Sequence, residues 1–243
     1  MDSKVQSICL WSGYAFFVLY LVGMVGVAGF IPPPQPSWSA EETSAFFSDN
    51  QTRILLGMSL CAFAAALYVP WGVSIFGEMV RMENTRIPLL SVAQVVSAGV
   101  GAAFLALSPL LWLALAYRDS YSSESVGILN DFAWIAWIVS WPFFFVQAGA
   151  LGLCILMHPT ATIPRWVGYF SIWFGLSMFP ASLIVFFDQG PFAWNGVIGI
   201  YLPLTMFAIW YQVVTFYLRK GIRNRAAIAE RDAVSDSRVT VPA

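Results

Sequence analysis

Six long apolar runs constrain the fold of this chain more than any other feature of its sequence. They cover about residues 8–31, 53–77, 88–116, 129–157, 166–187 and 195–218. Each has the roughly 20 residues that a helix needs to cross the hydrocarbon core of a bilayer. Charged residues make up only 10% of the chain, against about 25% in a soluble domain. The sequence therefore predicts an all-α polytopic membrane protein whose residues 1–218 form a six-helix transmembrane bundle.

The distribution of lysine and arginine predicts the orientation of this bundle. With the N-terminus inside, only Arg53 and Arg118 fall in outer segments. The other ten basic residues then fall in inner segments: Lys4, Arg81, Arg86, Arg165, Arg219, Lys220, Arg223, Arg225, Arg231 and Arg238. Basic residues collect in cytoplasmic loops, so we expect both termini in the cytoplasm. Residues 219–243 are expected to form a polar cytoplasmic tail.

The residue inventory excludes most chemistry known from membrane enzymes. His158 is the only histidine, and the three cysteines lie in separate apolar runs, whereas a zinc or iron site needs several such ligands together. No nucleotide-binding glycine pattern and no nucleophile elbow occurs. The net charge of −1 creates no field that attracts nucleic acid. We therefore expect no metal, no cofactor and no nucleic-acid partner.

Local signals predict how the helices begin and how they pack. The segment Ser39-Ala40-Glu41-Glu42 matches a capping box, which predicts a short helix in the outer connection 32–52. Small residues at helical spacing, such as Gly23, Gly26 and Gly152, predict close contacts between helices. No charged residue lies deep within a predicted run, which argues against a coupled ion pump, because a pump needs an acid at that depth.

Prolines are the most unusual feature within the runs. Pro109, Pro142, Pro180 and Pro203 fall at mid-depth or in the outer half of runs three to six. A proline inside a helix leaves a carbonyl without its partner and bends the helix. Four bends at similar depth would open a pocket toward the outer side, although proline is also simply commoner in membrane helices than in soluble ones.

Polar residues gather at the predicted outer rim and form the candidate ligand-binding site. Its members are Asp131, Asp188, Asn195, Trp194 and Arg118. Asp131 and Asn195 also suit the first turn of a helix, where a short polar side chain caps free N–H groups. The sequence leaves both interpretations open, a ligand site and helix capping.

Four segments carry a resemblance to other proteins: PPPQPSWSAEE, LNDFAW, IPRWVGY and GPFAWNG. In these segments the chain resembles a group of uncharacterised bacterial multispanning proteins that is frequent among mycobacteria and related lipid- and steroid-degrading organisms. The likeness covers the membrane region. It implies a multi-pass protein of the bacterial inner membrane, and it transfers no activity, substrate or catalytic residue.

Three functions remain open at this point. The first is binding or passage of a small hydrophobic or amphipathic molecule through an outward-facing pocket, since apolar pockets with few polar groups are the usual form of such sites. The second is a structural or accessory subunit that packs on a membrane-protein partner or on a second copy of itself. The third is a membrane enzyme that uses Asp131 and Asp188 as an acid/base pair. Membrane lipids are expected as partners in every case.

Overall fold

The computed structural model describes residues 3–118, 120–158 and 163–239 and shows an all-helical protein. Its elements are α1 (Ser3–Leu21), the π-helix η1 (Val22–Val27), α2 (Ala40–Asp49), α3 (Gln51–Glu83), α4 (Leu89–Ala116), α5 (Ser123–Val139), α6 (Trp141–Met157), α7 (Arg165–Ser177), the 3-10 helix η2 (Phe179–Phe186), the π-helix η3 (Val197–Tyr201) and α8 (Leu202–Val239). They combine into six helical segments that are long and apolar enough to cross a membrane. The predicted six-helix transmembrane bundle is confirmed.

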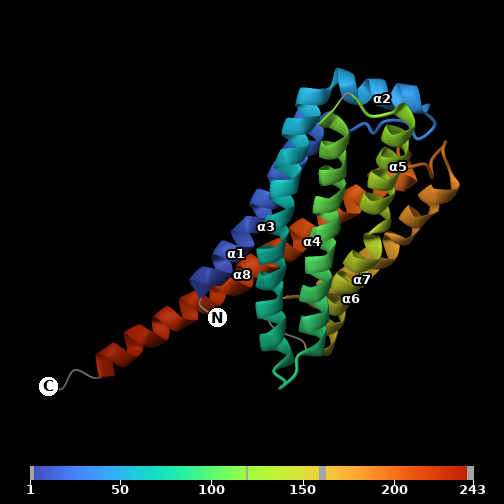
Figure 1. Cartoon of the computed structure of the whole chain (residues 1–243). Helices are drawn as coiled ribbons and strands as arrows, with labels where there is room; N and C mark the ends of the chain where they lie inside the picture. The colour runs from blue at the N-terminus through green and yellow to red at the C-terminus, as the bar shows by residue number, and fades with distance from the viewer. Residues whose placement is uncertain (1–2, 119, 159–162, 240–243) are drawn as a thin grey trace.

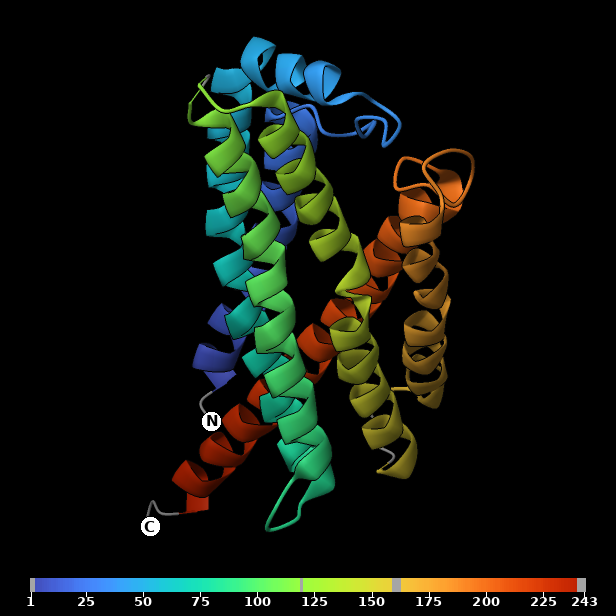
Figure 2. The ribbon, with the colours of Figure 1, turned by 45° about the vertical axis from the view of Figure 1, so that its right-hand side comes forward.

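The bundle has two distinct ends (Figure 1). Both termini lie at one of them, which we call the terminal end, and α2 lies across the other, which we call the α2 end. Helix α8 crosses the bundle diagonally and projects beyond the terminal end (Figures 1 and 2). The segment that was predicted as a polar tail therefore begins as an extension of α8, which continues to Val239. Residues 240–243 of that segment lie outside the described residues.

The start of α2 follows the predicted capping box. The hydroxyl of Ser39 accepts a hydrogen bond from the amide of Glu42 at 3.2 Å, and the Ser39 amide donates to the Glu42 carboxylate at 2.8 Å. These two bonds satisfy donors that the first turn of a helix otherwise leaves free. Phe47 on the inner face of α2 is buried against Phe30, so the short helix covers this end of the bundle.

Large aromatic side chains fill the centre of the bundle. Trp71, Tyr68 and Tyr211 are fully buried, and the rings of Trp71 and Tyr211 stack with centroids 4.1 Å apart. The Trp71 indole N–H donates to the hydroxyl of Thr215 at 3.0 Å, which satisfies its polar atom without water. Large apolar side chains such as Ile8 and Phe186 are instead exposed on the outside of the bundle, as a surface that faces lipid requires.

Two pairs of glycines bring helix backbones together. Gly23 of η1 faces Gly57 of α3, and Gly152 of α6 faces Gly168 of α7. An added Cβ atom at Gly57 would lie 2.5 Å from the Gly23 carbonyl oxygen, and one at Gly152 would lie 2.7 Å from the Gly168 oxygen. The expected close contacts at Gly23 and Gly152 are therefore confirmed. The expectation is wrong for Gly26, since a Cβ there would meet no atom within 4 Å.

Candidate functional site: an apolar cavity and a terminal polar cluster

An apolar cavity of about 330 Å³ lies between α1, the α5–α6 junction and α8. Seven of its 21 lining residues are aromatic: Phe16, Phe17, Tyr20, Trp137, Trp141, Phe144 and Phe207. Its few polar groups are largely occupied. The Tyr20 hydroxyl donates to the Leu105 carbonyl at 3.1 Å, and the Trp141 indole donates to Ser182 at 2.6 Å. The cavity therefore offers mainly hydrocarbon and ring surface to an occupant.

Departures from the α-helix surround this cavity. The π-helix η1 contributes Met24 and Val25, the start of η2 contributes Ala181, and the π-helix η3 contributes Gly199 and Ile200. Between α5 and α6 the helix is interrupted at Ser140, and the nearby residues Ile138 and Trp141 also line the cavity. Because irregular turns displace side chains from regular helical rows, these four segments leave a space that regular helices would close.

The prolines predicted to open a pocket contribute unequally. Pro142 lies in the first turn of α6, directly after the interruption at Ser140, Pro180 lies in η2, and Pro203 follows η3 and lines the cavity. Pro109 lies inside α4, which continues without interruption. Three of the four prolines thus coincide with irregular turns beside the cavity, and the fourth does not.

The cavity opens sideways between α1 and α8. These helices meet near the middle of the bundle, where an added Cβ at Gly13 would lie 2.4 Å from the Tyr211 hydroxyl. Toward the α2 end, Leu21, Val25 and Thr205 line the cavity and are also exposed on the outer surface. The opening therefore faces the region that lipid tails occupy around a transmembrane bundle.

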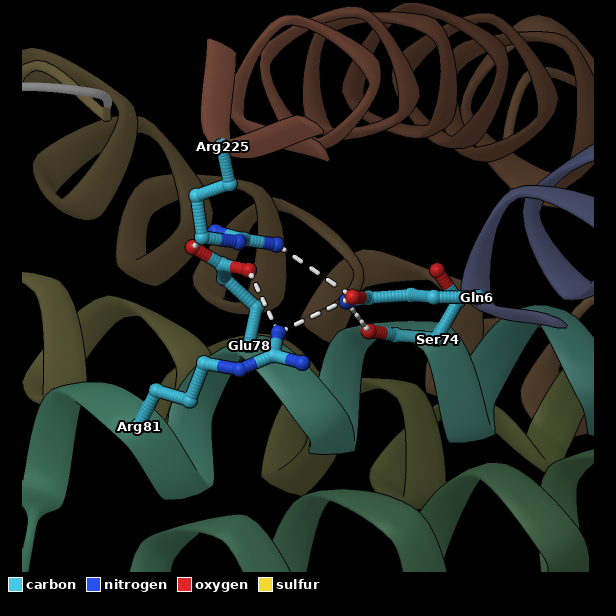
Figure 3. A network of polar contacts seen from close by, with 5 residues as sticks. All are labelled: Gln6, Ser74, Glu78, Arg81 and Arg225. Carbon is cyan, nitrogen blue, oxygen red and sulfur yellow. Dashed lines mark hydrogen bonds and ion pairs between the residues drawn. The ribbon is translucent and has the colours of Figure 1, made fainter. Parts of the chain in front are cut away.

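A polar cluster ties α1, α3 and α8 together at the terminal end (Figure 3). The buried carboxylate of Glu78 pairs with Arg225 at 2.5 Å and with Arg81 at 3.4 Å. Both guanidinium groups also donate to the side-chain oxygen of buried Gln6, at 2.9 Å from Arg81 and 3.2 Å from Arg225. The Gln6 amide nitrogen donates in turn to the carbonyl of Ser74 at 3.1 Å. The cluster therefore links α1, α3 and α8 at the terminal end of the bundle.

A second buried acid at the same end holds the start of α4. The Glu83 carboxylate accepts hydrogen bonds from the amides of Leu90 at 3.2 Å and Ser91 at 2.7 Å and from the Ser91 hydroxyl. The N-cap residue of α4 is Pro88, which makes no side-chain cap. Glu83 thus supplies the negative charge and the acceptors that the N-terminus of a helix favours.

The structure places the predicted rim residues apart from the cavity lining. Asp131 is exposed on α5, Asp188 is exposed in the connection after η2, and Asn195 is half-buried before η3. Arg118 is exposed beyond α4, with its guanidinium 5.4 Å from the Tyr117 ring centre. Trp194 is buried, and its indole donates to the Pro34 carbonyl at 2.8 Å. In the described part of the chain, no hydrogen bond or ion pair joins Asp131, Asp188 and Arg118 to one another.

The capping interpretation of two rim residues is wrong. The N-cap of α5 is Ser122, whose side chain accepts from the Ser125 amide, so Asp131 lies two turns inside the helix. The N-cap of η3 is Gly196 rather than Asn195. Their role as ligand-binding residues stays a prediction.

Sequence analysis missed the cavity lining and the terminal cluster. The predicted second span ended at residue 77, whereas α3 continues to Glu83. The predicted connection between the second and third spans therefore includes Glu78 and Arg81. An acid and a base three positions apart on a continuing helix would have been the signal.

Comparison with protein-family models, with known proteins and with solved structures finds no match to this chain. Its function is therefore inferred from the geometry of the cavity and of the residues around it.

Proposed function

We propose that the protein binds the hydrocarbon part of a membrane lipid, or another hydrophobic molecule, in the cavity between α1 and α8. The observation that supports this is the combination of size and lining. The volume of about 330 Å³ lies in the range of about 300–1,000 Å³ that is typical of ligand pockets. The lining is mainly apolar and the space opens toward the bilayer between α1 and α8, so lipid chains have direct access to it. Hydrocarbon is the better filling, since apolar cavities exclude water.

The route and the setting follow from the same surface. Lipid tails surround the exposed lining residues Leu21 and Val25, so an occupant enters sideways from the bilayer and needs no aqueous channel. The hydrogen bond from Trp194 to Pro34 joins the two connections at the α2 end, and neither residue lines the cavity. Asp188 and Asn195 stand in the same connection and are proposed to face a lipid headgroup. We place the protein in the bacterial inner membrane.

Filling the cavity with a larger side chain tests this proposal. Ala208 is half-buried and lines the cavity, so Ala208→Phe should occupy part of it and reduce the lipid that co-purifies with the protein by about tenfold, because one displaced chain loses several buried methylene groups. Native mass spectrometry of the gently extracted protein measures the bound lipid. Ala114→Phe is the matched control, since Ala114 is exposed on α4 outside the cavity, and it should retain wild-type lipid.

Equal lipid on the wild type and on Ala208→Phe would contradict the proposal. A membrane protein that co-purifies at fixed stoichiometry, with no lipid in the cavity, would instead support an accessory subunit.

The proposed orientation has a separate test. In a Cys9→Ser background, a cysteine introduced at Ser48 should react with an impermeant maleimide in intact cells, and one at Asn224 should react only after lysis. Both positions are exposed, at the α2 end and the terminal end respectively, and the expectation follows from the ten-to-two distribution of basic residues. The reverse labelling would place both termini outside.

A further inference from the structure

We infer that the occupant of the cavity is a phospholipid of the leaflet at the α2 end, with its phosphate bound by Arg53. This inference rests on the proposed function, because it names the lipid class and the residue that recognises it. Three observations carry it: the depth of the cavity, the position of Arg53 beside the turn between the lining residues Val25 and Ile31, and the absence of an ion pair to this arginine among the described residues.

The cavity has the depth of a single leaflet. On α8 and η3 the lining runs from Gly199 to Ala208, and on α1 and η1 it runs from Phe16 to Val25. Each stretch covers nine residue steps, which is at most about 14 Å at the rise of an α-helix, because η1 and η3 are π-helices and α8 runs diagonally (Figure 2). One leaflet contributes about 15 Å of hydrocarbon, so the lining fits within a single leaflet. Phe16, Phe144 and Phe207 close the cavity toward the centre, where their rings meet Tyr68. A chain in the cavity therefore ends near the bilayer midplane, and its headgroup lies at the α2 end.

Arg53 lies outside the cavity lining, at the start of α3, beside the turn that joins two lining residues. Its Nε–H donates to the carbonyl of Val27 at 3.1 Å, and its guanidinium lies 3.2 Å from the point where a Cβ at Gly29 would be. Gly29 has φ +72°, a left-handed conformation that glycine adopts without strain and that turns the chain back after η1. The residues on either side of this turn, Val25 and Ile31, both line the cavity.

The charge of Arg53 is available to a ligand. The side chain is exposed, and among the described residues it takes part in neither of the ion pairs, which involve Glu78 with Arg81 and Arg225. Only one of its donors is used by the Val27 carbonyl. A guanidinium offers five N–H donors in a planar fork that matches the oxygens of a phosphate. Arg53 and Arg118 are the two basic residues in the predicted outer segments, where lysine and arginine are less frequent than in cytoplasmic loops.

The test compares two lipids that share their chains and differ in phosphate. Detergent-purified protein is exchanged against dioleoylphosphatidylglycerol or dioleoylglycerol, and bound lipid is measured by native mass spectrometry. The wild type should prefer the phospholipid by about tenfold, the value expected for one charge-assisted contact. Arg53→Gln should reduce this preference to about twofold or less, and Arg53→Lys should keep part of it, since a lysine retains the charge but loses the planar fork.

Two further variants separate the possible failures. Arg86→Gln removes an exposed arginine in the connection between α3 and α4, at the terminal end and away from the cavity lining, and should leave the preference unchanged. A loss of preference equal to that of Arg53→Gln would show general surface attraction and overturn the inference. Equal binding of both lipids by the wild type would also overturn the inference. The proposed function would still stand if Ala208→Phe lowers the bound amount of both lipids. If Ala208→Phe lowers the bound amount of neither lipid, the proposed function fails together with the inference.

Discussion

Replacing Gly57 with alanine should lower the apparent melting temperature of the detergent-purified protein by about 5–10 °C, from a loss of about 2–3 kcal/mol. The added methyl carbon would lie 2.5 Å from the Gly23 carbonyl oxygen and 2.7 Å from the Ala28 amide nitrogen. Both neighbours are backbone atoms, so no side chain can rotate to relieve the contact. Helix α3 must move away from η1, and since η1 forms one wall of the cavity, lipid retention should fall with the melting temperature.

Gly26→Ala is the matched control for this substitution. It adds the same methyl group in the same glycine-rich segment, where no atom lies within 4 Å of the new carbon. Alanine also restricts the unfolded chain more than glycine does, so Gly26→Ala should be neutral or slightly stabilising. Equal melting temperatures for Gly57→Ala and the wild type would mean that η1 and α3 do not pack as closely as the structure shows.

The number of membrane-crossing segments could be predicted from the sequence, because a bilayer demands a continuous apolar length. Some of their ends could be predicted as well, since α4 spans Leu89–Ala116 and α6 ends at Met157, but others could not. At α3, Glu78, Arg81 and Glu83 resemble the polar start of a loop, but the helix continues through them, since Glu78 is paired with arginines and Glu83 caps α4. Pairing of this kind depends on residues that are far away in the chain, and a single apolar run carries no sign of it.

The fourth span shows the same limit at its start. Its start was expected at residue 129, yet α5 begins at Ser123 after a cap at Ser122. Residues 123–128 fall in the predicted connection because hydropathy is low there. They form the first turns of α5, where water and headgroups can solvate exposed side chains such as Glu124.

The cavity lining could not be predicted, for a reason particular to membrane proteins. In a soluble helix the apolar residues mark the face that is buried in the core. In a bilayer the outer face is apolar as well, because lipid tails are as apolar as leucine. Phe16 in the cavity and Val18 on the lipid-facing surface are therefore equivalent in the sequence pattern, although one is 2% exposed and the other 55%. The polar rim residues stand out in the sequence only because polar residues are rare in such a chain.

Replacing Glu78 with glutamine should lower the apparent melting temperature by about 4–8 °C, which corresponds to about 2 kcal/mol. The variant keeps the size of the side chain and removes its charge. Arg81 and Arg225 would still converge on the side-chain oxygen of Gln6, now without an anion between them. We expect a smaller loss of stability than the 3–5 kcal/mol typical of breaking a fully buried pair. The two arginine side chains are 34% and 33% exposed, so water screens part of the repulsion between them.

A double-mutant cycle then separates pairing from mere loss of a buried group. Arg225→Gln alone leaves the buried Glu78 carboxylate with only its longer ion pair to Arg81. This variant should lower the free energy of unfolding by about 1–2 kcal/mol. Combining it with Glu78→Gln removes both charges of the 2.5 Å pair, so the double variant should lose less stability than the sum of the two single variants. Arg223→Gln is the matched control, since Arg223 is exposed two residues earlier on α8 and should change stability little.

Additive effects in the cycle would show that α8 is held against α1 and α3 by its buried aromatic residues alone. In that case breaking the cluster should also leave lipid retention unchanged, because the crossing of α1 and α8 that bounds the cavity would not depend on it.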